Sequence, residues 1–303
     1  MRKAAVVALS TGALLTLSPL ATPAQAAVPV PPIASKGAVL LNSSGTAVYT
    51  KTPDTRRQMA STTKIMTAAV VVTTKGINLN HVVTVKQAYR DYVVKNGAST
   101  ADLKTGDKVT VRQLLYGTML PSGCDASYAL AELLGKGTTP AARVKSFIGK
   151  MNAKATQLGL KNTKFDSFDG ISAAGQNYTS PRDLAKITQY AMTNVNFRTV
   201  VAAPKYVTTA TTSKGTKRTY TWYNTNQLLG SYKGAIGIKT GTGTTAGPCL
   251  VFAATRNGKT FVGVTLNGAA RYTDAAKLLD FGFGSTTAKT MQLRSLPAGA
   301  EQD

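Results

Sequence analysis

The sequence predicts an α+β fold in which both ends of the chain build one antiparallel sheet around an inserted helical subdomain. Residues 37–51 alternate in polarity around an NSSG turn and predict a β-hairpin. Residues 205–266 again consist mainly of strand-like segments, whereas apolar residues recur at helical spacing through most of the chain between. We therefore expect a sheet region at about 36–60 and 205–284 and a helical region at about 61–204.

The elements can be assigned in order along the chain. A largely buried helix should begin near Ser61 and run to about residue 74. Short strands should follow at 81–85 and 108–111. The remaining helices are expected at 112–120, 125–134, 141–159, 180–193 and 271–283. The later strands are expected at 205–212, 235–243 and 249–266, the last range containing an Asn-Gly hairpin turn.

The first residues predict a secretory signal peptide. Arg2 and Lys3 precede an apolar run, and Ala-Gln-Ala at 24–26 forms a small-x-small cleavage site. We expect a signal peptide at 1–26 and a single domain at 27–303, with no second C-terminal domain. No other stretch reaches the roughly 18 apolar residues of a membrane span. The protein should therefore be exported, to the extracellular space, the cell wall or the outer face of the cytoplasmic membrane.

The charge is strongly basic. The 36 Lys and Arg residues outnumber the 13 Asp and Glu residues, giving +23, or +21 without Arg2 and Lys3. Such a field favours polyanionic surroundings, so anionic wall polymers or lipid headgroups are candidate partners. We expect no nucleic-acid partner, because the basic residues are scattered and few aromatic residues lie among them. A solvated cationic surface without a specific partner is an equally good interpretation.

The residue inventory excludes several chemistries. His81 is the only histidine, and two cysteines, Cys124 and Cys249, cannot complete a zinc site, so we expect no metal. No glycine-rich nucleotide motif opens a helix after a strand, and we expect no cofactor. His81 begins an extended segment and is more typical of a surface residue than of a catalytic base. The two cysteines of an exported chain could also form a disulfide.

One Ser-x-x-Lys sequence, Ser61-Thr-Thr-Lys64, opens the first predicted helix. Ser61 could simply cap that helix. A cation in the first turn opposes the helix dipole, however, so Lys64 is a poor choice for stability. Side chains three apart share a helix face, and a lysine whose charge is disfavoured by its surroundings can accept a serine proton. The motif therefore indicates a nucleophile and its base.

Lys-Thr-Gly occurs twice. Lys104 begins the first copy, which lies in a polar segment typical of a turn. Lys239 begins the second, which follows the apolar run GAIGI and lies on a predicted strand whose glycine allows close approach of a ligand. We interpret the second copy as functional.

STTK at 61–64, SGC at 122–124 and KTG at 239–241 resemble, in order and separation, the low-molecular-mass penicillin-binding serine DD-peptidases. Longer stretches are also similar, among them TVRQLLYGTMLPSGCDASYALAE, SPRDLAKIT and GAIGIKTGTG, and the similarity runs from about 36 to 284. The resemblance implies the serine β-lactamase and DD-peptidase fold, with a five-stranded antiparallel sheet, flanking helices and a helical lobe across the cleft.

The resemblance also implies roles for individual residues. Ser61 would be the nucleophile, Lys64 its general base, and Ser122 a proton relay to the leaving amine. The backbone N–H groups of Ser61 and Thr242 would form the oxyanion hole. The substrate-binding residues that it implies are Cys124, Lys239, Thr240, Gly241 and Thr242.

Cys124 departs from the family pattern, because the middle motif is usually Ser-x-Asn. A thiol donates and accepts hydrogen bonds only weakly, so the contact that asparagine makes to the substrate is altered. Some members with Ser-Gly-Cys are strict transpeptidases, which mildly favours acyl transfer to an amine. An alternative is that Cys124 is itself the nucleophile, with lysines favouring its thiolate.

The function implied is a serine-type D-alanyl-D-alanine carboxypeptidase or transpeptidase. It would act on peptidoglycan stem peptides ending in D-Ala-D-Ala, release D-alanine and be acylated by β-lactams. One alternative is a class A-like β-lactamase, which needs a glutamate on a loop between the second and third motifs. The two glutamates, Glu132 and Glu301, do not lie in such a loop. A second alternative is a non-catalytic cationic wall-binding protein.

Overall fold

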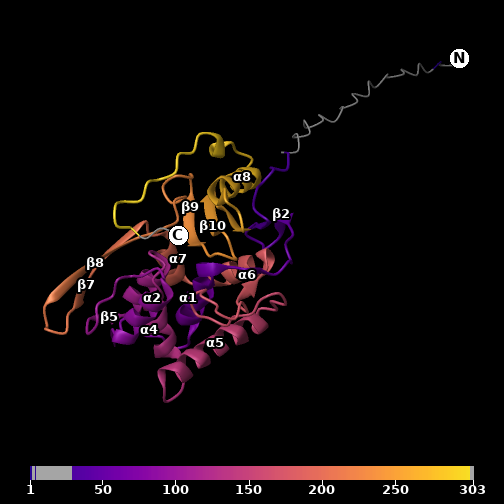
Figure 1. The fold of residues 1–303 in the computed structure, drawn as a ribbon. Coiled ribbons are helices and arrows are strands. Elements are labelled where there is room, and N and C mark those ends of the chain that lie inside the picture. Colours follow the sequence, from indigo (N-terminus) through magenta and orange to yellow (C-terminus); the bar gives the residue numbers. More distant parts are fainter. Residues whose placement is uncertain (2–3, 5–28, 301–303) are drawn as a thin grey trace.

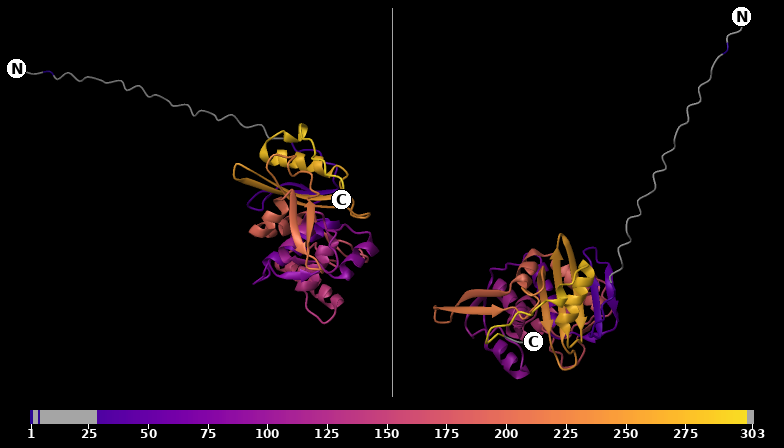
Figure 2. Two further views of the ribbon diagram at one scale, coloured as in Figure 1. Left: turned by 90° about the vertical axis from the view of Figure 1, so that its left-hand side faces the viewer. Right: turned by 90° about the horizontal axis from the view of Figure 1, so that it is seen from above.

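The computed structural model describes residues 29–300, together with Met1 and Ala4. The predicted signal peptide at 1–26 otherwise lies outside the described residues. Figure 1 shows a sheet with α8 on one side of it and a group of helices on the other. The left-hand view of Figure 2 shows the same layers edge-on.

A five-stranded antiparallel sheet forms the centre of the fold, with strand order β2-β1-β11-β10-β9. Strands from the two ends of the chain therefore meet at β1 and β11, which confirms the predicted sheet. The central strands β10 and β11 are each buried at six of their eight positions, as expected for a sheet covered on both faces. The strands are β1 (Gly37–Leu41), β2 (Ala47–Lys51), β9 (Ala235–Gly241), β10 (Cys249–Arg256) and β11 (Lys259–Leu266).

Alternation along β10 divides the core into two layers. Leu250 and Phe252 pack with Leu278 and the rest of the apolar face of α8 (Arg271–Phe283). Val251 and Ala253 face the opposite side, towards the large core of the helical region. The strand thus lies between α8 and the helices that share the large core, which include α1 (Lys64–Thr73), α3 (Val111–Met119), α4 (Cys124–Leu134), α6 (Pro181–Met192) and α7 (Val195–Ala202).

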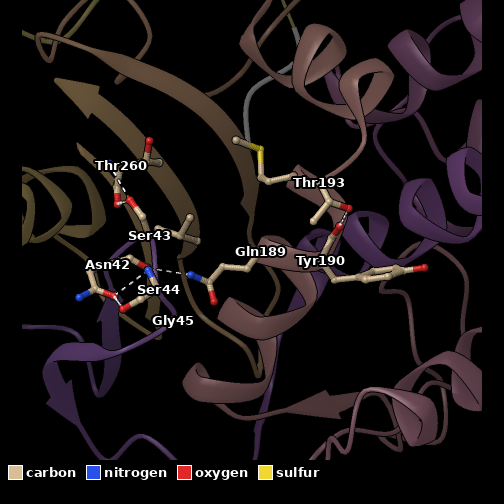
Figure 3. Close-up of a pocket in the computed structure, with 10 residues that line it drawn as sticks. Asn42, Ser43, Ser44, Gly45, Gln189, Tyr190, Thr193 and Thr260 are labelled. Carbon is tan, nitrogen blue, oxygen red and sulfur yellow. Dashed lines mark hydrogen bonds between the residues drawn. The ribbon is translucent and has the colours of Figure 1, made fainter. Parts of the chain in front are cut away.

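The first hairpin folds as predicted. The side chain of Asn42 accepts hydrogen bonds from the N–H groups of Ser44 and Thr46, and Gly45 supplies a positive φ of 82°. Gln189 of α6 donates to the carbonyl of Asn42, which ties the turn to the helical region (Figure 3). The pocket in that figure, about 440 Å³, is lined by none of the predicted site residues.

The strand predicted at 205–212 forms, but it lies outside the five-stranded sheet. It is β7 (Lys205–Thr211), which pairs with β8 (Lys217–Tyr223) and through β5 (Lys108–Thr110) with β4 (Val82–Thr84). Exposed and partly buried positions alternate along β7, so only one face of this strand is packed against the protein. The central strands are packed on both faces, which explains why β7 belongs to a separate sheet. The hairpin β7–β8 projects from the body in Figure 1.

Two helices were not expected from the sequence, α2 (Gln87–Asn96) and α7. The apolar residues of α2 are mostly aromatic or β-branched, and only Tyr89 is fully buried, so its helical period is weak. The predicted helices at 112–120, 125–134, 141–159, 180–193 and 271–283 all form, within a few residues of their expected limits. The third of these is α5 (Pro140–Gln157), and a short pair, β3 (Arg57–Gln58) and β6 (Tyr178–Thr179), lies beside the first helix.

Candidate active site

Ser61 lies in a 3₁₀ turn, η1 (Ala60–Thr63), that leads directly into α1. The turn is fixed by its own hydroxyls, since Thr62 donates to the carbonyl of Met59 and Thr63 to that of Ala60. Ser61 is not the N-cap of either segment, so the capping interpretation is wrong. Its Oγ instead accepts a hydrogen bond from Nζ of Lys64 at 2.9 Å.

Lys64 is fully buried beneath the turn. Besides its contact with Ser61, its Nζ donates to the main-chain carbonyl of Asp169 at 3.0 Å. The carboxylate of Asp169 is occupied elsewhere, by the hydroxyl of Tyr92 at 2.8 Å and the N–H of Ile171 at 3.0 Å. The amine is therefore held between the serine hydroxyl and a backbone dipole, which orients its nitrogen towards Oγ.

Gly170 allows this loop to lie against the nucleophile turn. Its φ is +103°, and a Cβ at this position would lie 2.1 Å from the carbonyl oxygen of Ala60 and 2.9 Å from the amide nitrogen of Ser61. A side chain is excluded by both contacts and by the backbone conformation. The loop and the turn thus form one unit around Ser61 and Lys64.

Ser122 has a strained backbone, with a positive φ of 65°, and is fully buried. Its carbonyl accepts a hydrogen bond from Oγ of Ser99 at 2.9 Å, which holds the conformation. Its own Oγ is buried and has no hydrogen-bond partner within the described part of the chain. Strain together with an unpartnered buried hydroxyl is typical of a functional position.

The strand β9 carries the Lys-Thr-Gly sequence at 239–241. Lys239 and Thr240 are buried, and Nζ of Lys239 donates to the carbonyl of Thr240 at 3.0 Å. Gly241 brings the strand against η1, because a Cβ there would lie 2.9 Å from the amide nitrogens of Ser61 and Thr62. Since β9 is an edge strand, its unpaired side faces η1 and the cleft.

Ser61, Cys124 and Thr242 line one cleft of about 600 Å³. Its size suits a peptide or small-molecule ligand. The cleft is also lined by the end of α2, the Asp169 loop and the residues after β9, namely Asn96, Gly97, Ser99, Gly170, Ser172 and 243–246. The structure therefore brings the three predicted motifs to one site, with Lys64, Ser122 and Lys239 buried below its surface.

The sequence pattern of peptidase family S11, described as D-alanyl-D-alanine carboxypeptidase, matches residues 24–270. The chain is 56% identical over 288 residues to the D-alanyl-D-alanine carboxypeptidase of Streptomyces sp. strain K15, covering 93% of this chain and 99% of that protein. This chain belongs to the D-alanyl-D-alanine carboxypeptidase family.

A further relative and a solved structure support this assignment. The D-alanyl-D-alanine carboxypeptidase DacC of Escherichia coli K12 is 32% identical over 287 residues, which cover 91% of this chain and 68% of that protein. The crystal structure of the Streptomyces K15 DD-transpeptidase superposes with a TM-score of 0.83 at 58% identity, covering 85% of this chain and all of that one. The predicted DD-peptidase fold is thereby confirmed.

Within this DD-carboxypeptidase fold, Cys124 is the first residue of α4 and is buried. Its Sγ lies 3.9 Å from the carbonyl of Ser122 and 4.0 Å from Oγ of Ser99, which are weak contacts. Burial raises the pKa of the Cys124 thiol to about 12, although Lys64 acts in the opposite direction. A neutral thiol at ordinary pH is a poor nucleophile, which argues against the cysteine alternative.

The disulfide alternative is wrong, because Cys124 and Cys249 are both free and buried thiols. Burial also raises the pKa of Cys249, to about 11. The described residues contain no cluster of His, Cys, Asp or Glu that could hold a metal ion. His81 is exposed at the start of β4, and Lys104 begins a turn in which Gly106 has a φ of +86°.

Glu132 lies in α4 and does not line the cleft. It is buried and paired with Lys86 and Arg143, and it accepts a hydrogen bond from Tyr89 at 2.8 Å. Glu301 lies outside the described residues. Among the described residues, the cleft therefore contains no glutamate of the kind that the class A β-lactamase alternative requires.

Several site residues were not identified from the sequence. Arg271, at the start of α8, donates to Oγ1 of Thr242 at 2.9 Å and to the carbonyl of Gly241 at 3.2 Å. Asp169 and Ser99 support Lys64 and Ser122 through single contacts. The roles of Arg271 and Asp169 were missed because both residues contact groups of elements far away in the chain, which no local pattern indicates.

None of the helices among the described residues is both long and apolar enough to cross a membrane.

Proposed function

We propose that this protein is a serine-type D-alanyl-D-alanine carboxypeptidase and transpeptidase in which Ser61 is the nucleophile and Lys64 the general base. The observation that carries the assignment is the 2.9 Å hydrogen bond between Nζ of Lys64 and Oγ of Ser61 at the base of the cleft. Family membership supplies the reaction class, and this contact supplies the pair of groups that can begin it.

In the first step, Lys64 accepts the proton of Ser61 while Oγ attacks the carbonyl carbon of the penultimate D-alanine. The negative charge that develops on the carbonyl oxygen is stabilised by the N–H groups of Ser61 and Thr242. These lie close together because Gly241 packs against η1. Two such donors each contribute roughly 3 kcal/mol to the stabilisation of the transition state.

The C–N bond then breaks and D-alanine leaves as an amine, for which a proton is required. Ser122 is the relay, since its buried Oγ has no competing hydrogen-bond partner among the described residues. The positive φ of Ser122 and the bond from Ser99 to its carbonyl fix the backbone from which this hydroxyl extends. The proton passes from Lys64 through Ser122 to the leaving nitrogen, and an ester of Ser61 remains.

The stem peptide binds along the free edge of β9 as an additional antiparallel strand. Thr240, Gly241 and Thr242 present their main-chain groups to it, and a glycine in the middle allows the two backbones to approach. Lys239 and the hydroxyl-bearing Thr240 lie below and supply charge and hydrogen bonds for the terminal carboxylate. β-Lactams acylate Ser61 at the same place, because their ring carbonyl takes the position of the scissile peptide carbonyl and their carboxylate that of the terminal carboxylate.

The ester is resolved by water or by an acceptor amine. Cys124 lines the cleft where the family usually has asparagine, and its thiol is a weak partner for the substrate amide or for a water molecule. We favour transfer to an amine over hydrolysis on this ground. Product analysis with a D-Ala-D-Ala peptide, with and without added glycine, tests it. Glycine adducts should dominate when glycine is present, and free acid as the main product in its presence would overturn this preference.

The protein is proposed to act outside the cytoplasmic membrane after removal of residues 1–26, where its substrate is found. Attraction of its +21 surface to anionic wall polymers or lipid headgroups stays a prediction. Retention on purified cell walls that weakens as salt is raised from 0.05 M to about 0.5 M would support it.

A further inference from the structure

The chain continues for more than fifteen residues after α8, and this tail crosses the molecule. It passes through η2 (Thr287–Lys289) and then runs without regular structure along the end of the sheet towards β8 (Figures 1 and 2). Ala300 lies near Tyr220 and Trp222, so the end of the tail is placed beside the small sheet. The tail therefore joins the α8 side of the molecule to the helical side.

Arg294 fixes the middle of the tail. Its N–H donates to Oγ of Ser231 at 2.7 Å, and its carbonyl accepts from Nε2 of Gln227 at 2.8 Å. Its guanidinium turns inward, and Nη2 donates to the carbonyls of Asn224 at 2.6 Å and Asn226 at 3.2 Å. Its second nitrogen, Nη1, reaches the carbonyl of Pro204 at 3.5 Å. The guanidinium thus joins a buried segment to a neighbouring carbonyl through two nitrogens, which the single nitrogen and shorter reach of a Lys side chain do not reproduce.

The segment held in this way, residues 224–226, lies between the two catalytic motifs. All three residues are nearly inaccessible to solvent. The N–H of Thr225 donates to the carbonyl of Leu120 at 3.2 Å, two residues before Ser122. The hydroxyl of Thr225 bonds that of Thr240, in the Lys-Thr-Gly sequence, at 2.5 Å. Residues 224–226 therefore connect the Ser122 loop to the substrate-binding strand.

Of the carbonyls in this segment, that of Asn224 depends most on Arg294, because the Asn226 carbonyl also accepts the N–H of Leu229 at 3.2 Å and the Thr225 carbonyl accepts the hydroxyl of Tyr272 at 3.0 Å. Asn224 uses Nδ2 to bond the carbonyls of Val201 and Ala203, and its Oδ1 accepts the N–H of Asn226. These bonds fix Asn224 but do not involve its carbonyl. Removal of the guanidinium would take the charged donor from the buried Asn224 carbonyl and weaken the hold on Asn226, and the segment would move to recover hydrogen bonds.

We propose that Arg294 is a positioning residue for substrate binding, acting through residues 224–226 on Thr240. It touches neither substrate nor the Ser61–Lys64 pair, which is held by η1 and the Asp169 loop instead. This inference rests on the proposed function, because it takes Thr240 to line the peptide site. Its signature is a change in substrate affinity with little change in the rate of the bound complex.

The test compares Arg294→Ala and Arg294→Lys with Leu293→Ala, which alters the adjacent residue, 40% exposed, and leaves the bridge intact. Hydrolysis and transfer of a D-Ala-D-Ala peptide are followed over a range of concentrations. We expect KM to rise about tenfold in Arg294→Ala, equivalent to about 1.4 kcal/mol, with kcat changed less than threefold. Arg294→Lys should be intermediate and Leu293→Ala unchanged.

Two kinetic results would overturn the proposal. One is an unchanged KM in a folded Arg294→Ala protein. The other is a kcat that falls in proportion to the folded fraction while KM is constant, which would show a merely structural role. If Arg294→Ala does not fold, Arg294→Lys decides alone, since it keeps the charge and loses the bridge.

Amide hydrogen exchange gives a readout that does not depend on activity. In Arg294→Ala, residues 224–226 and 239–241 should exchange faster than in the parent protein, while η1 and α1 should not change. Faster exchange in a protein that no D-Ala-D-Ala peptide or penicillin acylates would refute the proposed function and leave the structural link intact. Equal exchange in both proteins would refute the link itself.

Discussion

Nζ of Lys64 donates to Oγ of Ser61 at 2.9 Å and is held in place by the carbonyl of Asp169 at 3.0 Å. The lysine is fully buried, so its contact with the serine is not exchanged for contacts with bulk water. This arrangement places a base within reach of the one hydroxyl that both lines the cleft and opens the first helix. The mechanism depends on this contact more than on any other.

Replacement of Lys64 should slow acylation with little loss of binding. In Lys64→Gln an amide cannot accept the serine proton, and general-base catalysis is worth 10²- to 10⁴-fold, so we expect the acylation rate by a fluorescent penicillin to fall by about 10³-fold. Lys75→Gln, at an exposed position just after the same helix, is the control and should acylate normally. A rate within tenfold of the parent in Lys64→Gln would contradict the assignment.

Gly170 should tolerate no side chain. In Gly170→Ala the new Cβ would meet Ala60 at 2.1 Å at a positive φ, and we expect a loss of about 3 kcal/mol in stability, from strain and overpacking together. Acylation should fall with it, because the loop carries the carbonyl that holds Lys64. The control is Gly175→Ala in the same loop, where φ is +66° and the nearest atom is the end of the Gln58 side chain at 3.3 Å.

Urea denaturation and penicillin labelling measure the two effects of the Gly170 substitution. Gly175→Ala should lose only about 1 kcal/mol and keep its labelling rate. Equal behaviour of the two variants would show that the contact between the loop and η1 is not required.

Cys124 should be dispensable for acylation. Cys124→Ser is expected to react with penicillin at a rate similar to the parent, and loss of acylation in a folded Cys124→Ser protein would revive the thiol nucleophile. Because burial raises the thiol pKa to about 12, the native protein should also resist iodoacetamide at pH 8 and react only after unfolding. Rapid alkylation of the native protein at pH 8 would contradict this environment.

Glu132 should stabilise the fold at neutral pH and lose this contribution in acid. Burial alone would raise its pKa, but hydrogen bonds from Lys86, Arg143 and Tyr89 outweigh burial and lower it. A carboxyl whose folded pKa is lowered stabilises the fold above its unfolded pKa, about 4.3, and loses that contribution as the pH falls through the folded pKa.

The corresponding experiment is urea denaturation of Glu132→Gln. It should be less stable than the parent by about 2 kcal/mol at pH 7. The difference should shrink below about pH 4, where the parent's carboxyl also becomes neutral. A constant difference from pH 7 to pH 3 would show that shape, not charge, explains the loss.

The sequence was most informative where chemistry or periodicity was local. Ser61 and Lys64 are three residues apart at the start of a predicted helix, and this context placed their side chains on one face, where the structure shows them in contact. The residues that flank the two Lys-Thr-Gly copies distinguished them, since only Lys239 follows an apolar, strand-like run. The Asn257-Gly258 turn formed for the same reason, because both residues adopt the positive φ that this hairpin requires.

Contacts between distant segments could not be predicted. The strand at 205–212 has strand-like composition, but which sheet it joins depends on partners at β5 and β8. Arg271 and Arg294 are two among many cations, and their importance comes from carbonyls that the fold brings to them. Ser122 was placed by its motif, whereas the strain at its φ is visible only in the structure.

The central claim is that Ser61 forms the acyl-enzyme. The most direct measurement is mass spectrometry of the intact protein and of its peptides after incubation with benzylpenicillin, for the parent and for Ser61→Ala. We predict one adduct per parent molecule, located on the peptide that contains Ser61, and none on Ser61→Ala with the fold retained by circular dichroism. An adduct that persists in Ser61→Ala, or that maps to Cys124 or Ser122, would contradict the account.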